Sequence, residues 1–322
     1  MTRPPVPARR AELLSIGTTD ATLARERRRG DLLSIVPGSY VTREDWAALD
    51  GLARHRLRVL ETAARLKTQP VYSHFAAAAL LGIRILNEWP ERIDVTLERS
   101  SGGRSGGLLR RRCTGLDDVD VVSLDGLLVT SPAQTVTDLA RELPFADGVV
   151  AMDSALHRKR RPRPLLTVDE LDARVAASAG KPGHRRAVAC ARFATPLSDS
   201  PQESHSRVQI HLLGFPEPEL QSRLLLPDGS TAELDFRWPQ YDHGGECDGR
   251  AKYRNPEFLR GRTPTEAVID EKNRENQVRR VVSRLSRWEP AHLYPPARLY
   301  DLLTADGLPS SKPRPPRTTR WT

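Results

Sequence analysis

The chain has 322 residues and a net charge of +9, from 50 lysine and arginine residues against 41 aspartate and glutamate residues. This length allows two or three domains, and the excess of cationic side chains favours a polyanionic partner, nucleic acid first. Its longest apolar runs are too short to span a bilayer, and the N-terminus lacks the apolar core of a signal peptide. We therefore expect a cytoplasmic protein with no membrane partner.

The N-terminal residues 9–48 carry the pattern of a small DNA-binding unit. Thr18-Thr19-Asp20 can cap a helix that ends at Gly30, and a Pro37-Gly38 turn separates two apolar runs. The expected elements are helices over 11–16 and 21–29 and short strands over 32–36 and 40–41. A helix, a turn, an arginine-rich helix and a hairpin follow one another in a winged helix.

The second of these helices carries the candidate DNA contacts Arg25, Arg28 and Arg29. In a winged helix these side chains would point toward a groove or toward phosphates. The alternative, of about equal weight for so short a unit, is that the arginines only solvate an exposed helix face.

Residues 52–195 indicate a mixed α/β region. Ser131 can cap a helix that has Pro132 at its first position and runs to about residue 143. Other expected elements are helices over 57–66 and from Ser73-His74 through 81, and a strand over 93–97. The glycines of 100–107 lack the lysine and Ser/Thr of a P-loop, and the basic run 157–163 is expected to be a solvated connector.

The three cysteines, Cys113, Cys190 and Cys247, lie far apart with no histidine at metal-ligand spacing. This pattern argues against a disulfide framework and against a structural zinc site. Histidines such as His74 and His205 show no triad or ligand spacing and are expected to be structural or surface residues.

The last folded unit begins with a helix from Ser200 through residue 213. An Asp228-Gly229 turn joins strands over 223–226 and 231–238, which is a strong hairpin signal. Strand alternation predicts one face with Ala232, Leu234 and Phe236, and an opposite face with Glu233, Asp235 and Arg237. A strand with Glu246, a charged helix over 265–280 and a β-rich segment over 281–288 complete the unit.

Three carboxylates, Asp235, Glu246 and Asp248, stand close together in this unit. Glu246 and Asp248 are two residues apart on an expected strand, so they would project to the same face and Cys247 to the other. Clustered carboxylates suit a hard divalent cation such as Mg²⁺ or Mn²⁺. The alternative is that they are solvated strand and turn residues, where most acidic side chains belong.

The order of these elements and several sequence pieces within residues 202–288 resemble the PD-(D/E)XK nuclease superfamily, in its DUF559 or Vsr-like branch. The pieces are Pro-Glu-Pro-Glu-Leu-Gln at 216–221, Pro-Asp-Gly at 227–229, Asp235-Phe236, the segment 246–253, the segment 271–275 and Arg287-Trp288. The resemblance implies a nuclease fold whose strand carboxylates hold divalent ions for phosphodiester hydrolysis.

By that resemblance Asp235 and Glu246 are the metal ligands, and the implied catalytic set is Glu203, Asp235, Glu246, Asp248 and Lys252. Asp248 stands where the signature has a lysine, so Lys252 or Lys272 would supply the positive charge. The approach to Glu246 also departs from the family, because Gly244-Gly245 replaces an apolar strand. Glu203 could equally be one half of a capping box with Ser200. Arg274 and Arg287 match positions that contact phosphate, although surface arginine is the default for each alone.

Residues 9–160 loosely resemble AbiEi-family antitoxins of type IV toxin–antitoxin systems. The matching pieces are residues 32–41, Ser73-His74-Phe75-Ala76-Ala77 and the segment 129–140. The resemblance implies DNA binding, autoregulation of transcription and a cognate toxin partner.

The sequence therefore predicts an α+β multidomain protein. The expected parts are a winged helix at 1–50, a central α/β domain at 51–197, a restriction-endonuclease-like α/β/α domain with a mixed sheet at 198–300, and a disordered tail at 301–322. Two functions compete: a DNA-binding protein with a metal-dependent endonuclease domain, and an AbiEi-type regulator with an inactive nuclease-like domain. A nonenzymatic adaptor explains the carboxylates least well.

Overall fold

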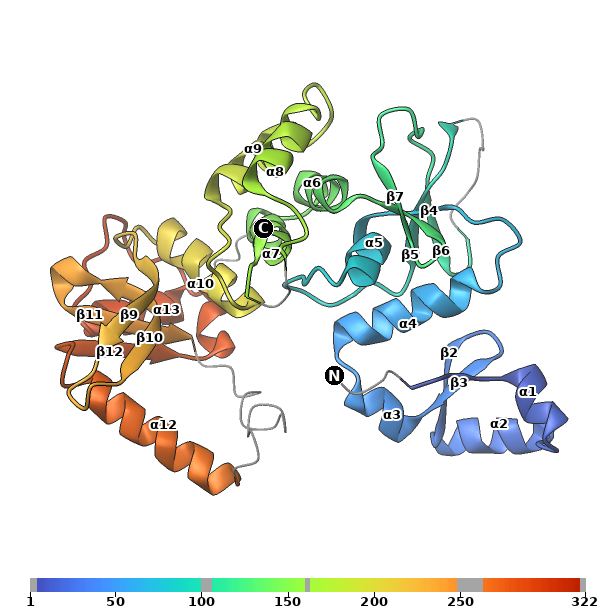
Figure 1. Ribbon diagram of the computed structural model, residues 1–322, viewed down its shortest axis with the longest axis horizontal. Helices are drawn as coiled ribbons and strands as arrows, with labels where there is room; N and C mark the ends of the chain where they lie inside the picture. The colour runs from blue at the N-terminus through green and yellow to red at the C-terminus, as the bar shows by residue number, and fades with distance from the viewer. Residues whose placement is uncertain (1–4, 100–105, 160–162, 248–262, 319–322) are drawn as a thin grey trace. The chain divides into compact units, whose positions relative to one another are not determined.

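A computed structural model describes residues 5–99, 106–159, 163–247 and 263–318. The described residues form an α+β protein with three β-sheets, and the chain divides into two compact units (Figure 1). The first unit comprises residues 1–142 and 165–188, and the second comprises 143–164 and 189–322. This division differs from the predicted boundaries, because residues 143–164 and 189–197 belong with the C-terminal unit.

The N-terminal part of the first unit contains the predicted helices and hairpin. The Thr19 hydroxyl accepts a hydrogen bond from the Thr22 N–H, and Gly30 ends the second helix at φ 80°. The elements are β1 (Ala8–Arg9), α1 (Arg10–Ser15), α2 (Asp20–Arg29), β2 (Leu32–Val36), β3 (Ser39–Thr42) and α3 (Arg43–Ala48). The three strands form an antiparallel sheet in the order β1-β3-β2.

The rest of the first unit is a five-stranded mixed sheet in the order β6-β5-β4-β8-β7, with helices packed against it. Its elements are α4 (Gly51–Ala63), β4 (Val71–Tyr72), α5 (His74–Leu81), β5 (Ile93–Thr96), β6 (Leu109–Arg112), β7 (Val121–Leu124), β8 (Leu127–Thr130), α6 (Pro132–Glu142) and α8 (Val168–Ala176). Ser131 caps α6 as predicted, because its hydroxyl accepts from the Gln134 N–H. The helix predicted over 57–66 instead begins at Gly51, where the Asp50 carboxylate accepts from the Ala53 N–H.

The second unit is built on a four-stranded sheet in the order β12-β11-β10-β9. Its elements are α7 (Phe145–Leu156), α10 (Pro201–Leu212), β9 (Glu219–Leu225), β10 (Thr231–Trp238), β11 (His243–Cys247), α12 (Pro264–Val278), β12 (Arg284–Trp288) and α13 (Ala297–Ala305), while α9 (His184–Phe193) crosses the boundary between the units. Strands β9, β10 and β11 are antiparallel, and β12 lies parallel to β11.

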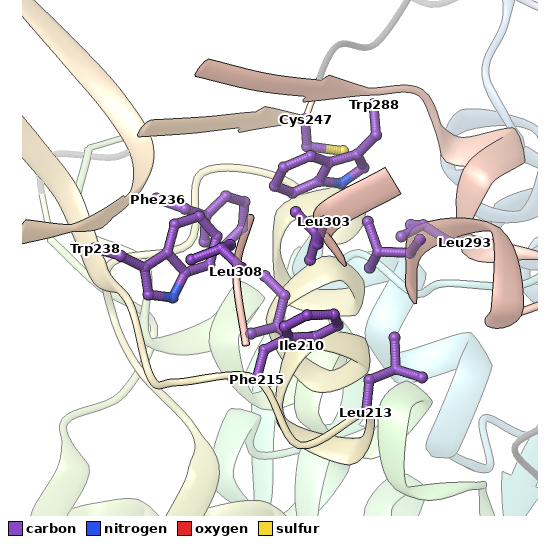
Figure 2. Packing of buried hydrophobic residues seen from close by; sticks show 11 residues of the cluster. Ile210, Leu213, Phe215, Phe236, Trp238, Cys247, Trp288, Leu293, Leu303 and Leu308 are labelled. Carbon is purple, nitrogen blue, oxygen red and sulfur yellow. The ribbon is translucent and has the colours of Figure 1, made fainter. Parts of the chain in front are cut away.

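The predicted alternation along β10 is wrong at its centre. Leu234 packs in a cluster with Val278 and Val282 beneath α12, whereas Phe236 packs in the larger cluster with Ile210 of α10 and residues of α13 (Figure 2). Two residues at a spacing of two therefore lie on opposite faces of the sheet. The reversal falls at Asp235, the first residue of the predicted metal site.

Strand β11 forms in spite of its two glycines, and packing on both faces explains why glycine stands there. A Cβ on Gly244 would lie 2.7 Å from Leu234 Cδ1, and a Cβ on Gly245 would lie 3.0 Å from both Trp238 and Trp288. The strand is buried along its whole length. The glycines thus admit large neighbours from β10 and β12.

Gly245→Ala is expected to lower the free energy of unfolding by about 1–3 kcal/mol, because the two indoles must move to admit the methyl group. Chemical denaturation measures the change. Gly229→Asn is the control, since Gly229 sits in an open turn at φ 84°, a conformation that asparagine tolerates. Equal stabilities of wild type and Gly245→Ala would contradict the packing explanation.

The expectation of a disordered tail over 301–322 is wrong for the part that the structure describes. Helix α13 extends to Ala305, and Leu308 is buried in the large cluster. Arg314 forms an ion pair with Asp301, and the Ser311 N–H donates to the Gly214 carbonyl. The Pro- and Arg-rich composition misled the prediction because the segment is also fixed by Gly214 and by the large cluster, which are distant in sequence. Across the described ranges, no helix has the length and apolar character needed to cross a membrane.

Candidate functional site

The candidate site lies along one row that crosses the sheet of the second unit. Phe236 pairs with Gly245, and Asp235 and Glu246 are the residues next to this last pair on β10 and β11. On the other side of β11, Glu246 pairs in register with Arg287 of β12. The fold therefore brings three of the residues that the sequence singled out, Asp235, Glu246 and Arg287, onto adjacent positions of three strands.

Glu246 is buried and faces α12, and its carboxylate is held by one arginine of α12 and one of β12. Arg274 Nη2 donates to Glu246 Oε1 at 2.8 Å, and Arg287 Nε lies 3.4 Å from Glu246 Oε2. The two guanidiniums neutralise a carboxylate that would otherwise be costly to bury. Arg287 also donates to Glu275 of α12 at 2.7 Å. Burial alone would raise the pKa of Glu275, but its ion pairs with Arg279 and Arg287 lower it.

Asp235 is held in the middle of β10 by a contact with the neighbouring strand. Its Oδ2 accepts a hydrogen bond of 2.8 Å from the Cys247 N–H. Cys247 itself points into the large apolar cluster, as the sequence predicted from the alternation along its strand. The contact fixes the Asp235 carboxylate close to the residue that follows Glu246.

Glu203, the predicted helical carboxylate, lies in the first turn of α10 and bonds to the N-cap residue Ser200. Its N–H donates to Ser200 Oγ, and its carboxylate accepts from the Ser200 hydroxyl and from the Asp199 N–H, at 2.8 Å each. A third donor, Gln221 Nε2, lies 3.1 Å from Glu203 Oε2. Glu203 is therefore connected to the sheet through β9.

The remaining predicted site residues divide into two groups. Asp248 and Lys252 lie outside the described residues, while Lys272 is exposed on α12. Within the ranges that the structure describes, no group of three or more His, Cys, Asp or Glu side chains is arranged to hold a metal ion. Asp235 and Glu246 nonetheless offer two hard carboxylates from neighbouring strands, a donor type that fits Mg²⁺ or Mn²⁺.

The candidate DNA contacts of the first unit lie on the open surface. Arg25, Arg28 and Arg29 are exposed on α2, whereas Leu23 on the same helix is buried. Arg27 lies 5.9 Å from the centre of the Tyr40 ring on β3. The helix thus packs by one side and presents a cationic surface on the other.

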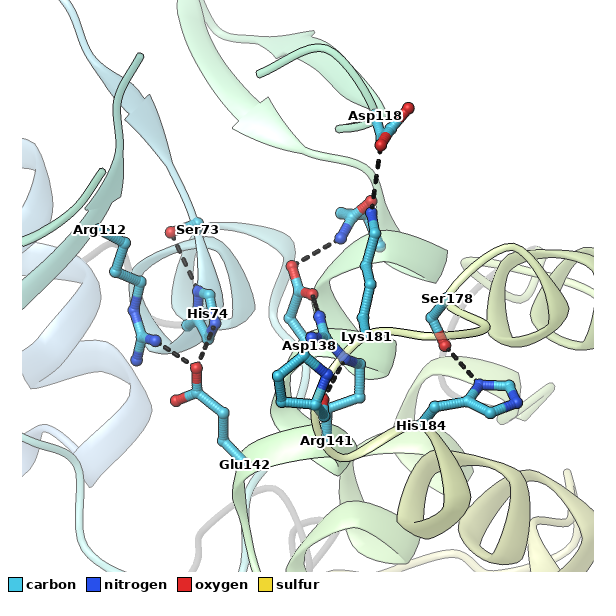
Figure 3. Close-up of polar contacts among 12 residues, drawn as sticks. Ser73, His74, Arg112, Asp118, Asp138, Arg141, Glu142, Ser178, Lys181 and His184 are labelled. Atoms are coloured by element: carbon cyan, nitrogen blue, oxygen red, sulfur yellow. Dashed lines mark hydrogen bonds and ion pairs between the residues drawn. The ribbon is translucent and has the colours of Figure 1, made fainter. Parts of the chain in front are cut away.

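A polar network that the sequence did not single out lies elsewhere in the first unit (Figure 3). His74 lies between Ser73 Oγ, at 3.1 Å, and Glu142 Oε1, at 3.3 Å, and Arg112 donates to Glu142 and to Asp94. Burial alone would raise the pKa of Glu142, but hydrogen bonds from His74 and Arg112 lower it to about 2. The network joins α5, β5, β6 and the end of α6.

Comparisons with known proteins name no activity for the chain. No family model matches the sequence. Two uncharacterised proteins of Mycobacterium tuberculosis, MT2308 of strain CDC 1551 / Oshkosh and Rv2248 of strain ATCC 25618 / H37Rv, are each 30% identical over 141 residues. The match covers 44% of this chain and 50% of theirs, so the chain spans about half the length of these curated relatives. The crystal structure of the Rv2827c protein from Mycobacterium tuberculosis aligns with a TM-score of 0.34 and 16% identity, over 63% of this chain and 75% of that one.

Proposed function

We propose that the protein binds DNA and that its second unit is a metal-dependent endonuclease that hydrolyses phosphodiester bonds. The observation that carries the proposal is the row across β10, β11 and β12, in which Asp235, Glu246 and Arg287 occupy adjacent positions. The element order α10-β9-β10-β11-α12-β12 supports it, because the resemblance to the PD-(D/E)XK nucleases implies this order.

The residues of this row have complementary tasks in such a reaction. Asp235 and Glu246 would hold the cation. When bound, Mg²⁺ or Mn²⁺ supplies an activated water and charge stabilisation at the phosphate. Arg287 and Arg274 present planar guanidiniums, whose paired donors match phosphate oxygens, and they hold the Glu246 carboxylate in place. The exposed arginines of α2 would supply affinity for the DNA backbone.

A specific observation favours a second function, a DNA-binding regulator of the AbiEi type with an inactive nuclease-like unit. Glu246 already has two arginine partners, so its charge is neutralised without a cation. A toxin partner would belong to this second function through the resemblance alone.

Plasmid cleavage separates the two functions. We expect the wild type to nick DNA with Mg²⁺ or Mn²⁺, and Asp235→Asn and Glu246→Gln to lose this activity, because each removes one anionic ligand. Glu217→Gln is the matched control, since Glu217 is an exposed carboxylate away from the row. Absence of cleavage with either ion, together with intact DNA binding, would instead support the regulator.

DNA binding is tested through its dependence on salt. Replacing Arg25, Arg28 and Arg29 with alanine is expected to weaken duplex binding and to reduce the slope of log K against log salt by about 2–3, close to 0.9 for each lost phosphate contact. Fluorescence anisotropy at several salt concentrations gives the slope. Arg223→Ala, which removes an exposed arginine of the other unit, should leave the slope unchanged. A slope unaffected by the triple substitution would rule out α2 as the DNA-contacting helix.

A further inference from the structure

Gln221 occupies the position on β9 that lies directly opposite Asp235. Ser222 pairs with Leu234 and Leu220 pairs with Phe236, which leaves Gln221 across from Asp235. Its backbone is left-handed, at φ 51°, which is uncommon for a residue other than glycine. Strain of this kind persists where surrounding contacts impose it, often at functional sites. Gln221 therefore extends the row of site residues to the fourth strand.

The Gln221 amide uses both of its ends to join separate parts of the second unit. Its Nε2 donates to Glu203 Oε2 of α10 at 3.1 Å, and its Oε1 accepts from Lys159 Nζ at 2.9 Å. Lys159 comes from the segment that follows α7, outside the stretch that resembles a nuclease. The fold thus adds a lysine that sequence spacing could not connect with Glu203 or Asp235.

Lys159 is a firmly cationic group with access to solvent. Its ammonium also donates to Glu233 at 2.7 Å and to Asp199 at 3.2 Å. Burial alone would lower the pKa of Lys159, but the bonds to Glu233 and Asp199 raise it, so the side chain stays charged at neutral pH. The side chain remains 48% exposed. The three N–H donors of the ammonium are directed to Asp199, Gln221 and Glu233, and because the side chain is half accessible a phosphate can reach the ammonium by displacing one of these acceptors.

We propose that Gln221 is a positioning residue that holds Glu203 beside Asp235, and that Lys159 provides the fixed positive charge for a DNA phosphate at this site. The inference rests on the proposed endonuclease function and adds two residues to its machinery. It would also supply a cation to a site that lacks the signature lysine. Neither residue binds the metal ion: Gln221 acts through Glu203, and Lys159 acts on the substrate.

Two substitutions in the full chain, with a matched control, test the two roles, and Mn²⁺ is the metal probe. Gln221→Met keeps the side-chain length but removes both hydrogen bonds. Lys159→Met removes the ammonium from Glu233, and Arg223→Met is its matched control, because Arg223 lies 3.7 Å from the same Glu233 but is 79% exposed. Isothermal titration with Mn²⁺, single-turnover plasmid cleavage and thermal unfolding are measured for each variant.

The two roles predict different patterns. Gln221→Met should weaken Mn²⁺ binding and slow cleavage about tenfold or more, the usual effect of losing a residue that orients a ligand. Lys159→Met should slow cleavage by a similar factor while Mn²⁺ binds as tightly as in wild type or more tightly, because a nearby positive charge has gone. A purely structural lysine would not separate the two measurements. Arg223→Met should stay within about twofold of wild type in both.

Gln221→Asn is the control for a folding defect. Asparagine tolerates the left-handed backbone, but its side chain is too short to join Glu203 and Lys159. It should reproduce the Gln221→Met defect at an unchanged unfolding temperature. The inference is overturned, and the endonuclease function is retained, under one combination of results. The Gln221 and Lys159 variants bind Mn²⁺ and cleave DNA as the wild type does, while Asp235→Asn loses both activities. Failure of the wild type to bind Mn²⁺ or to cleave would overturn the endonuclease, and this inference with it.

Discussion

Arg207→Met is expected to lower the free energy of unfolding of the second unit by about 3–5 kcal/mol, the usual cost of leaving one partner of a buried ion pair alone. Arg207 of α10 donates to both oxygens of Asp153 of α7, at 3.2 and 2.9 Å. The Asp153 side chain is fully buried and Arg207 is 9% exposed. Its guanidinium also lies 4.1 Å from the centre of the Phe193 ring. The substitution leaves the buried Asp153 carboxylate without its cationic partner.

The loss should depend on pH in a defined direction. Burial already raises the pKa of Asp153, while Arg207 and the Thr195 N–H oppose that rise. Without Arg207 the pKa rises further, so protonation of Asp153 should reduce the defect as the solution is acidified. Calorimetry over a range of pH measures this change.

Two variants test whether the stranded charge is the cause. Asp153→Asn combined with Arg207→Met should recover much of the stability, because the amide oxygen can still accept from the Thr195 N–H while no charge is buried. Arg192→Met, at an exposed position of α9, should change stability by no more than about 0.5 kcal/mol. If the double variant is no more stable than Arg207→Met, lost packing and not lost charge pairing explains the defect.

Local chemistry made much of the fold predictable from sequence. Thr19 and Gly30 mark the ends of α2, Ser131 marks the start of α6, and the Asp228-Gly229 turn sets the limits of β10. In each case the determining contacts join residues a few positions apart, so the pattern and its cause lie in the same short stretch of sequence. Local turn and strand signals also predict that Asp235 and Glu246 lie on neighbouring strands.

The parts that sequence could not supply depend on contacts between distant residues. The reversal of faces at Asp235 occurs opposite Gln221, whose left-handed backbone no composition rule predicts. The pairing of Glu246 with Arg274 and Arg287 requires α12 and β12 to be in place. Lys159 reaches Gln221 from 62 residues away. A spacing rule can propose the carboxylates, but only the fold identifies their partners.

Acidification itself is expected to destabilise the second unit through His205 of α10. Burial lowers the pKa of His205 from 6.5 to about 4, and the side chain is surrounded by Gln209 and the Tyr294 ring. The unfolded chain therefore binds more protons than the folded chain between these two values. Stability from this group is complete above pH 6.5 and is lost as the pH falls toward 4, by about 2 kcal/mol at pH 5.

His205→Gln separates this effect from other titrations, because glutamine keeps a polar group near Gln209 but cannot take up a proton. The variant should lose about 2 kcal/mol less than wild type when the pH is lowered from 7 to 5, as measured by denaturant unfolding at each pH. His55 provides an internal comparison in the first unit, since burial and the nearby Arg58 lower its pKa to about 4 as well. The first unit should therefore keep its own pH dependence in His205→Gln, and a common loss of pH dependence in both units would contradict the assignment to His205.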